Sequence, residues 1–269
     1  MRAVTGSVDR VRAAGIWEDI DRRYRAAQES QASSTIDTQA QALLDKETGV
    51  EFVLQVAAKL QSKPNNNGSH EYAGERNART GQPRSLDPPP FNPFLPYDEA
   101  LWVRHLSPTH TLLLNKFNVL PRHVLVVTRE FRPQGMALEA ADFEAVWQVL
   151  LAAPEPGAAG RSSSRPGGAP DAAFAAYERL CAVAGVFGAR EEEPRGQPTI
   201  AIDYNLLCTR DYLQLIPRSW EKVDDFACNA LGFAGTFLAR SEETLAFIRR
   251  RTPSGVLVAV GFPWTDDRV

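Results

Sequence analysis

The strongest constraint on the fold is a pair of short apolar segments near the middle of the 269-residue chain. The first runs from Thr111 to Leu114 and the second from His123 to Thr128, and a polar connection that contains a proline joins them. Runs of this length, rich in Leu and Val and bounded by Asn and Pro, are typical of strands. We therefore predict two adjacent antiparallel strands, at least one of which is buried on both faces.

The connection between these strands carries polar side chains that suit a ligand. Asn115, Lys116, Asn118, Arg122 and His123 should all lie around one strand end. Ammonium, guanidinium and amide groups are the donors that bind phosphate and hydroxyl oxygens. The sequence therefore predicts a place here that can hold a phosphate or a ribose.

The composition limits the partners and the compartment. The hydrophobic content of 43% is enough for one large domain or two small ones. The net charge of -3 gives no general attraction to nucleic acid or to a membrane, so an anionic ligand needs a local cluster of cations. Three cysteines without a CxxC spacing predict neither a disulfide framework nor a zinc site. The absence of a long apolar run and of a targeting signal leads us to expect a cytoplasmic protein.

The patterning divides the chain into four regions. They are an N-terminal amphipathic helix and polar linker at 1–48, the first part of a domain at 49–152, a low-complexity linker at 153–170 and the second part of the same domain at 171–269. The second region includes a loop at 64–90 that we expect to be disordered, because it has no apolar period.

Hydrophobic periodicity and turn residues predict the remaining elements. We expect helices at 8–29, 137–151, 171–185, with Asp171 as N-cap, and 241–250, with Ser241 as N-cap. We expect strands at 50–56, 200–209 and 212–216, a strand-like run at 231–239 in which Gly232 and Gly235 indicate close backbone approach, and a final strand or extended segment at 256–263.

Four separated blocks carry a resemblance to a known family. They are NPFLPY, LLLNKFNVLPRHVLVVTREF, YNLLCTRDYLQLIPRS and LGFAGTFLAR. In this order they resemble the diadenosine tetraphosphate phosphorylase family, also called ATP adenylyltransferases, in the galactose-1-phosphate uridylyltransferase-like branch of the histidine triad superfamily. The resemblance covers about Phe52 to Pro263. It implies an α+β fold, with a histidine-triad-like antiparallel sheet and flanking helices.

The resemblance also shows what this sequence lacks. In the family, a histidine of a His-x-His-x-Gln segment attacks the α-phosphorus of a dinucleoside polyphosphate, and inorganic phosphate then cleaves the nucleotidyl-histidine to yield ADP. That segment should lie between the helix ending at Leu151 and the helix beginning near Asp171, where this chain has the linker Pro154 to Pro170. None of the four histidines, His70, His105, His110 and His123, forms a pair with this spacing. We therefore predict no catalytic residue, and a sheet that is incomplete in its central strands.

Five residues remain as candidates for nucleotide binding. The resemblance places Lys63, directly before a proline, near the ligand phosphates, and Asn115 at the ribose. We expect Lys116, Arg210 and Arg218 to contact phosphate, since ammonium and guanidinium groups suit it. Each has a plainer alternative: Asn115 can bond its own turn backbone, Lys63 can end a short helix at the surface, and the other three can be solvated surface cations.

By resemblance, the function is cleavage of diadenosine tetraphosphate with phosphate to ADP and ATP, impaired in this chain because the nucleophile is absent. The small-molecule partners would be diadenosine tetraphosphate, ATP, ADP and phosphate, with no nucleic acid and no membrane. No metal site and no resident cofactor is predicted, and a divalent cation such as magnesium is left open as a companion of the nucleotide. The alternatives are a non-catalytic nucleotide-binding or scaffold protein, or an incomplete gene product. The oligomeric state is not predicted.

Overall fold

The computed structural model describes residues 15–33, 38–57, 92–118, 120–133, 135–154, 170–187, 200–224 and 226–262. The predicted loop at 64–90, Lys63 and all but the ends of the predicted linker at 153–170 lie outside these residues. The division into four regions therefore stays a prediction.

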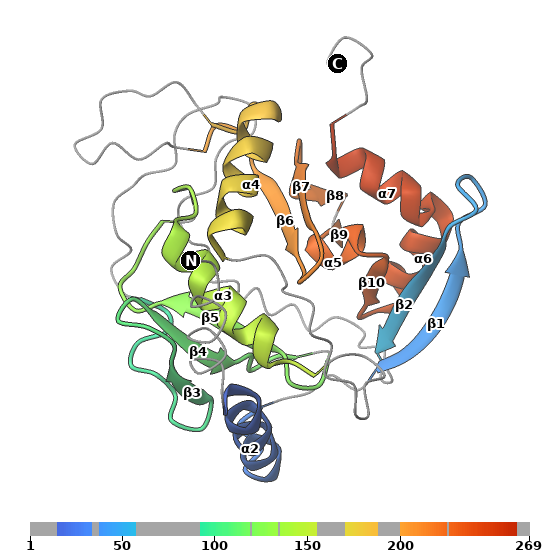
Figure 1. Cartoon of the computed structure of the whole chain (residues 1–269). Helices are drawn as coiled ribbons and strands as arrows, with labels where there is room; N and C mark the ends of the chain where they lie inside the picture. The colour runs from blue at the N-terminus through green and yellow to red at the C-terminus, as the bar shows by residue number, and fades with distance from the viewer. Residues whose placement is uncertain are drawn as a thin grey trace. The chain divides into compact units, whose positions relative to one another are not determined.

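Helices and strands alternate irregularly along the described chain (Figure 1). The helices are α2 (Ile16–Glu29), α3 (Ala140–Ala152), α4 (Pro170–Val183), α5 (Ala230–Phe233), α6 (Glu242–Arg251) and α7 (Pro253–Val260). The strands are β1 (Thr38–Leu44), β2 (Glu51–Ala57), β3 (Trp102–His105), β4 (His110–Leu114), β5 (Val124–Thr128), β6 (Tyr204–Cys208), β7 (Leu213–Pro217), β8 (Lys222–Val223), β9 (Phe226–Ala227) and β10 (Thr236–Ala239). This mixture confirms the predicted α+β class.

The chain forms two compact units, and the first contains residues 1–35, 86–180 and 208–213. Its sheet has the order β3-β4-β5, with both pairs antiparallel. Leu114 lies opposite Val124, and every residue of β4 is buried. The predicted pair of antiparallel central strands, one of them buried on both faces, is therefore confirmed.

Helix α2 covers part of this sheet through an apolar stripe. Ile16, Ile20 and Ala27 are fully buried and share one hydrophobic cluster with Leu112 and Leu114 of β4. Buried residues spaced by about one helical turn place the stripe on one face of the helix. The predicted amphipathic helix is thus confirmed from residue 16 to residue 29, and residues 8–14 lie outside the described chain.

The second unit contains residues 36–85, 181–207 and 214–269. Its sheet has the order β1-β2-β10, in which β1 is antiparallel and β10 parallel to β2. Alternate residues of β2, Phe52, Leu54 and Val56, are buried in a cluster that also contains residues of α6 and α7. The predicted strand at 50–56 is therefore confirmed as a half-buried strand of this sheet.

The structure corrects four predictions about the elements. Strand β1 lies inside the segment predicted as a polar linker, and β3 was not predicted. The segment at 256–263, predicted as extended, mostly forms helix α7. The run at 231–239 begins as helix α5 before it becomes strand β10. Asp171 lies in the first turn of α4 and does not precede it, because that helix begins at Pro170.

Other predicted elements are confirmed with small shifts of their ends. The hairpin is formed by β6 and β7, and Ser241 caps α6 by accepting a hydrogen bond from the Thr244 amide. A Cβ atom on Gly232 would lie 2.7 Å from the Cys228 sulfur, which confirms close approach at this glycine, but a Cβ atom on Gly235 would meet nothing within 4 Å, so the prediction was wrong there. The described strands form four separate sheets instead of one, including β6-β7 and β8-β9. Among the residues that the structure describes, no helix is long and apolar enough to cross a membrane.

Candidate functional site

The strand corner between β4 and β5 holds most of the side chains that the sequence singled out. The Asn115 amide donates a hydrogen bond of 2.9 Å to the His123 carbonyl, which continues the antiparallel ladder beyond the ends of both strands. Arg122, directly before this pair, has a φ of 57°, in the left-handed region that few side chains adopt. The connection is therefore a turn with a fixed backbone at its base.

Asn115 and Lys116 begin this turn. The Asn115 side-chain oxygen accepts a hydrogen bond of 3.1 Å from the Phe117 amide, and its amide nitrogen lies 3.4 Å from Nδ1 of His123. The first bond is the local turn contact that we gave as the alternative to ribose binding. Contact with a ribose stays a prediction, and it would have to share the Asn115 side chain with this turn bond.

Lys116 is a solvent-exposed cation beside an exposed aromatic ring. Its Nζ atom lies 6.0 Å from the centre of the Phe117 ring, and 63% of Phe117 is exposed. Within the described residues, no carboxylate lies at ion-pair distance from Lys116. An ammonium group without an ion pair can contact an anion without first breaking one. Its predicted role as a phosphate contact therefore remains open.

Asn118 and Arg122 connect the turn to helix α2. Asn118 is fully buried, and its side-chain nitrogen donates to the Ser33 hydroxyl at 2.8 Å. Nε of Arg122 donates to Asp21 at 2.7 Å, and its guanidinium lies 5.6 Å from the Tyr24 ring centre. The Arg122 hydrogen bond is the main reason why the pKa of Asp21 lies below its ordinary value. Arg122 therefore holds α2 to the corner, and Asn118 holds the segment that directly follows α2.

The three described histidines have partners other than a nucleotide. His123 approaches Asn115, and Nδ1 of His105 lies 3.1 Å from the Thr111 hydroxyl. Burial lowers the pKa of both imidazoles, which favours their neutral forms. His110 is buried, with Nε2 lying 2.8 Å from a carboxylate oxygen of Asp142.

Asp142, whose carboxylate lies beside His110, also accepts a hydrogen bond from the Glu139 amide at the start of α3. Burial would raise the pKa of Asp142, but hydrogen bonds from His110 and from the Glu139 amide outweigh this and lower it. The other ring nitrogen of His110 lies 2.9 Å from the Thr109 hydroxyl. Both nitrogens of His110 therefore have protein partners, and this histidine is placed as a structural group.

Arg210 lies at the carboxyl end of helix α3. Its Nε donates to the Leu150 carbonyl at 2.7 Å, and its Nη2 donates to the Ala153 carbonyl. The last carbonyls of a helix have no partners within the helix, so a guanidinium here satisfies them and balances the helix dipole. Arg210 thus has protein partners in the structure, and phosphate binding by it stays a prediction.

Arg218 lies in the second unit, where only 8% of it is exposed. Its five N–H groups donate to five oxygens: the Asn205 side chain and the carbonyls of Val260, Cys228, Trp220 and Glu221. The Phe233 ring lies 5.2 Å from its guanidinium carbon. Phosphate binding by Arg218 stays a prediction, and it would require the side chain to give up some of these bonds.

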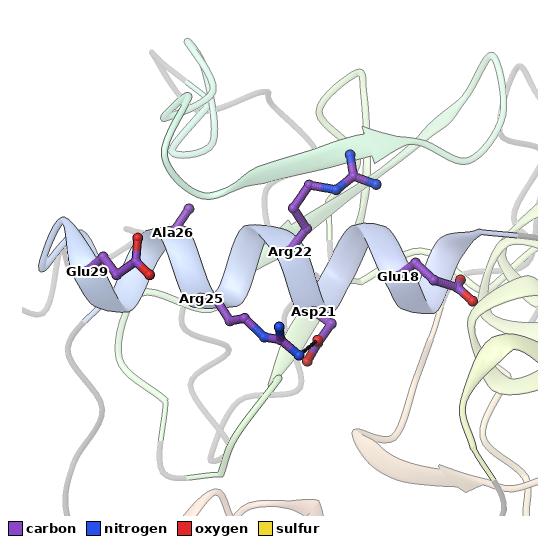
Figure 2. Close-up of a pocket in the computed structure, with 6 residues that line it drawn as sticks. All are labelled: Glu18, Asp21, Arg22, Arg25, Ala26 and Glu29. Carbon is purple, nitrogen blue, oxygen red and sulfur yellow. Dashed lines mark hydrogen bonds and ion pairs between the residues drawn. The ribbon is translucent and has the colours of Figure 1, made fainter.

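A surface hollow lies along helix α2 and contains none of the predicted site residues. Figure 2 shows its six lining residues, which are Glu18, Asp21, Arg22, Arg25, Ala26 and Glu29. Both arginines are already paired, Arg25 with Asp21 and Arg22 with Asp19, so Glu18 and Glu29 are left without a free arginine in the hollow. This balance does not suit a polyphosphate. Nowhere in the described chain are three His, Cys, Asp or Glu side chains placed so that they could hold a metal ion.

Of the predicted site residues that the structure describes in the first unit, Asn115 and Lys116 lie together at the corner, whereas Arg210 lies at the end of α3. The carbonyl partners of Arg210 and the Val260 carbonyl beside Arg218 come from distant parts of the sequence, and no local pattern indicated them. The fold and the corner define an α+β protein with a polar strand turn that presents an exposed cation.

Two family models match the chain in sequence order. The Ap4A phosphorylase N-terminal domain matches residues 7–155, and the ATP adenylyltransferase C-terminal domain matches residues 140–263. The chain belongs to the Ap4A phosphorylase family, as its resemblance indicated.

Individual relatives agree with this result. Diadenosine 5',5'''-P1,P4-tetraphosphate phosphorylase 2 of Saccharomyces cerevisiae is 28% identical over 136 residues, which cover 49% of this chain and 37% of the yeast protein. The crystal structure of yeast Ap4A phosphorylase Apa2 matches 93% of this chain and 98% of its own, with a TM-score of 0.66 and 19% identity. Apa2 in complex with AMP gives a TM-score of 0.66, and Apa2 in complex with Ap4A gives 0.57. These structures confirm the predicted fold.

Proposed function

We propose that this chain has the binding function of an ATP adenylyltransferase, with diadenosine tetraphosphate as its ligand and ADP and ATP as the products of the family reaction with phosphate. The observation that carries the proposal is the match of both family domains, in order, from residue 7 to residue 263. The nucleotide complexes of yeast Apa2 support a small-molecule nucleotide as the ligand. A cytoplasmic location belongs to the same proposal.

The covalent step of the family reaction is the part that we expect to fail. It needs an imidazole that attacks the α-phosphorus and later leaves as phosphate cleaves the P–N bond. The sequence has no His-x-His pair, and His105, His110 and His123 already have protein partners. The chain should therefore bind the dinucleotide without forming a nucleotidyl-histidine.

The experiment combines three measurements on the purified chain. Calorimetry with diadenosine tetraphosphate should show binding, acid-labile covalent nucleotide should be absent, and phosphate should not stimulate ADP release above background. Replacing Lys116 by Ala should weaken binding roughly tenfold, the size expected for one charge-assisted hydrogen bond. Lys46→Ala is the matched control, because Lys46 is an exposed lysine in the turn between β1 and β2.

Each result decides a different part of the proposal. Phosphate-dependent ADP release well above background would contradict the predicted loss of the covalent step. If calorimetry showed no binding of diadenosine tetraphosphate, the proposed function would be wrong for this chain. Equal loss of binding in the Lys116 and Lys46 variants would show that Lys116 is not a specific contact.

A further inference from the structure

Strand β5 presents one backbone edge that no other described strand uses. It is the last strand in the order β3-β4-β5. The bonds from Asn115 to His123 and from Arg129 to Thr109 show which residues face β4. Because the direction of backbone N–H groups alternates along a strand, Val124, Val126 and Thr128 point their N–H and C=O groups away from β4.

These outward groups have no backbone partner among the residues that the structure describes. The strand also lacks the features that normally protect a sheet edge. Its sequence, VLVVT, contains no charge and no proline, and its pairing with β4 has a regular register. At the opposite edge of the sheet, β3 carries Arg104 and has an irregular register between Trp102 and Arg104. Such interruptions and charges discourage pairing, so of the two edges of this sheet in the described chain, the β5 edge is the one suited to another strand.

We propose that this edge pairs with β5 of a second copy of the chain, in an antiparallel arrangement about a two-fold axis. Pairing centred on Val126 places Val124 opposite Thr128 of the other copy, and Val126 opposite its own equivalent. All three outward residues then lie in bonded pairs, and six hydrogen bonds form. A shift by two residues leaves only two such pairs, so the centred register is the one that satisfies the most backbone groups.

Charge at the ends of the strand supports a second copy as the occupant. In the centred register, Glu130 of one copy comes opposite Arg122 of the other, and the two-fold axis makes this contact twice. Glu130 is exposed, and Arg122 is partly exposed beside Asp21. Opposite charges across a strand pair stabilise it, so the flanking residues favour the same register as the backbone. The result is a continuous sheet of six strands.

The experiment compares two substitutions at Val126 in the full chain. Val126→Pro removes the outward N–H group but no bond to β4, and proline is tolerated on the free side of an edge strand. Val126→Ala keeps the N–H group and is the matched control for the loss of the side chain. Sedimentation equilibrium over a range of concentrations should show a dimer for the original chain and for Val126→Ala. The dissociation constant of Val126→Pro should rise roughly thirtyfold, because two of the six hydrogen bonds are lost.

Two further measurements keep the proposal testable if the proline variant does not fold. Glu130→Arg changes an exposed residue outside the strand and should weaken the dimer. Hydrogen exchange of the Val124, Val126 and Thr128 amides should slow as the protein concentration rises. A monomer at all concentrations would overturn the proposal, even if a strand of another protein were found to pair with this edge. A dimer that tolerates both Val126→Pro and Glu130→Arg would overturn it as well.

Discussion

At the scale of single residues, the two arginines that the sequence singled out are both bound to backbone carbonyls. Arg218 shows this most fully, because each of its five N–H groups has its own acceptor. Lysine has three donors and no planar fork, so it cannot replace this arrangement. The position therefore depends on the guanidinium group as such, and charge alone is not enough.

Arg218→Lys should accordingly lower the free energy of unfolding by roughly 2 to 4 kcal/mol, since at least two buried oxygens lose their donors. Urea denaturation measures this change. Arg240→Lys, at an exposed position, is the control and should leave the stability unchanged. If Arg218→Lys kept full stability but lost nucleotide binding, Arg218 would be a ligand contact and our structural interpretation would be wrong.

Asp45 is a second residue that has a partner from a distant segment. It is buried, and its carboxylate accepts hydrogen bonds from the Thr48 amide and from the Ser254 amide at 2.7 Å. The hydrogen bonds from Ser254, first from its side chain and then from its backbone, hold the pKa of Asp45 far below its ordinary value. The ionised form is therefore favoured in the folded chain. Its contribution to stability is present above the unfolded pKa of about 4 and is lost as the pH falls.

Asp45→Asn should lower the thermal midpoint by a few degrees at pH 7, because a neutral amide is a weaker acceptor for these donors. The difference between the two proteins should shrink as the pH drops below about 4, because Asp45 then takes up a proton in the unfolded chain while it stays ionised in the folded chain. Thermal unfolding by circular dichroism from pH 7 to pH 3 checks both expectations. Asp211→Asn, at an exposed turn position, should show neither effect.

At the scale of elements, helix α3 shows how a distant side chain completes a helix. Its first turn is closed by its own residues, because Glu139 and Asp142 form a reciprocal capping box. Its carboxyl end has no basic residue in the last turn and receives Arg210 from the hairpin between β6 and β7. The local sequence therefore specifies the start of α3, whereas its end is completed by a side chain from a distant segment.

Arg210→Ala should destabilise the chain by about 1 to 2 kcal/mol, because the carbonyls of Leu150 and Ala153 lose their charged donor. Hydrogen exchange should speed up in the last turn of α3, whose carbonyls Arg210 caps, and remain unchanged in α2. Uniform acceleration across both helices would contradict a local capping role. Arg240→Ala, at an exposed position, provides the control for loss of an arginine.

The elements that the sequence missed are held in place by contacts with other segments of the chain. Strand β1 has the sequence TQAQALL, and most of its residues are exposed. Because the strand has no buried face, its sequence does not show the alternation of apolar and polar residues that predicts a strand. Its backbone hydrogen bonds to β2 hold it in an extended conformation, so the strand forms because β2 lies beside it. The segment at 256–263 was predicted as a strand or extended segment because it is apolar, but most of it belongs to helix α7, whose amino end is fixed by the Thr252 cap and the Asp45 carboxylate.

At the scale of the whole molecule, nucleotide binding should appear as a gain in stability of the folded chain. A ligand that binds only the folded state raises the free energy of unfolding by about 2.7 kcal/mol at one hundred times its dissociation constant. Diadenosine tetraphosphate should therefore raise the thermal midpoint in a concentration-dependent way, as differential scanning fluorimetry can measure. The shift should be smaller for Lys116→Ala at equal ligand concentration and unchanged for Lys46→Ala. Equal shifts in all three proteins would contradict a role for Lys116.

The sequence by itself determined the α+β class, the central strand pair, the family and the absence of the His-x-His pair. These follow from apolar periodicity and from motifs, both of which are local properties of the chain. Only the tertiary structure decided the partners of Arg210, the distant partners of Arg218 and Asp45, the pairing of β1 and the open edge of β5. Hydrogen bonds to backbone groups and sheet edges join segments that are distant in sequence, and no local pattern specifies them.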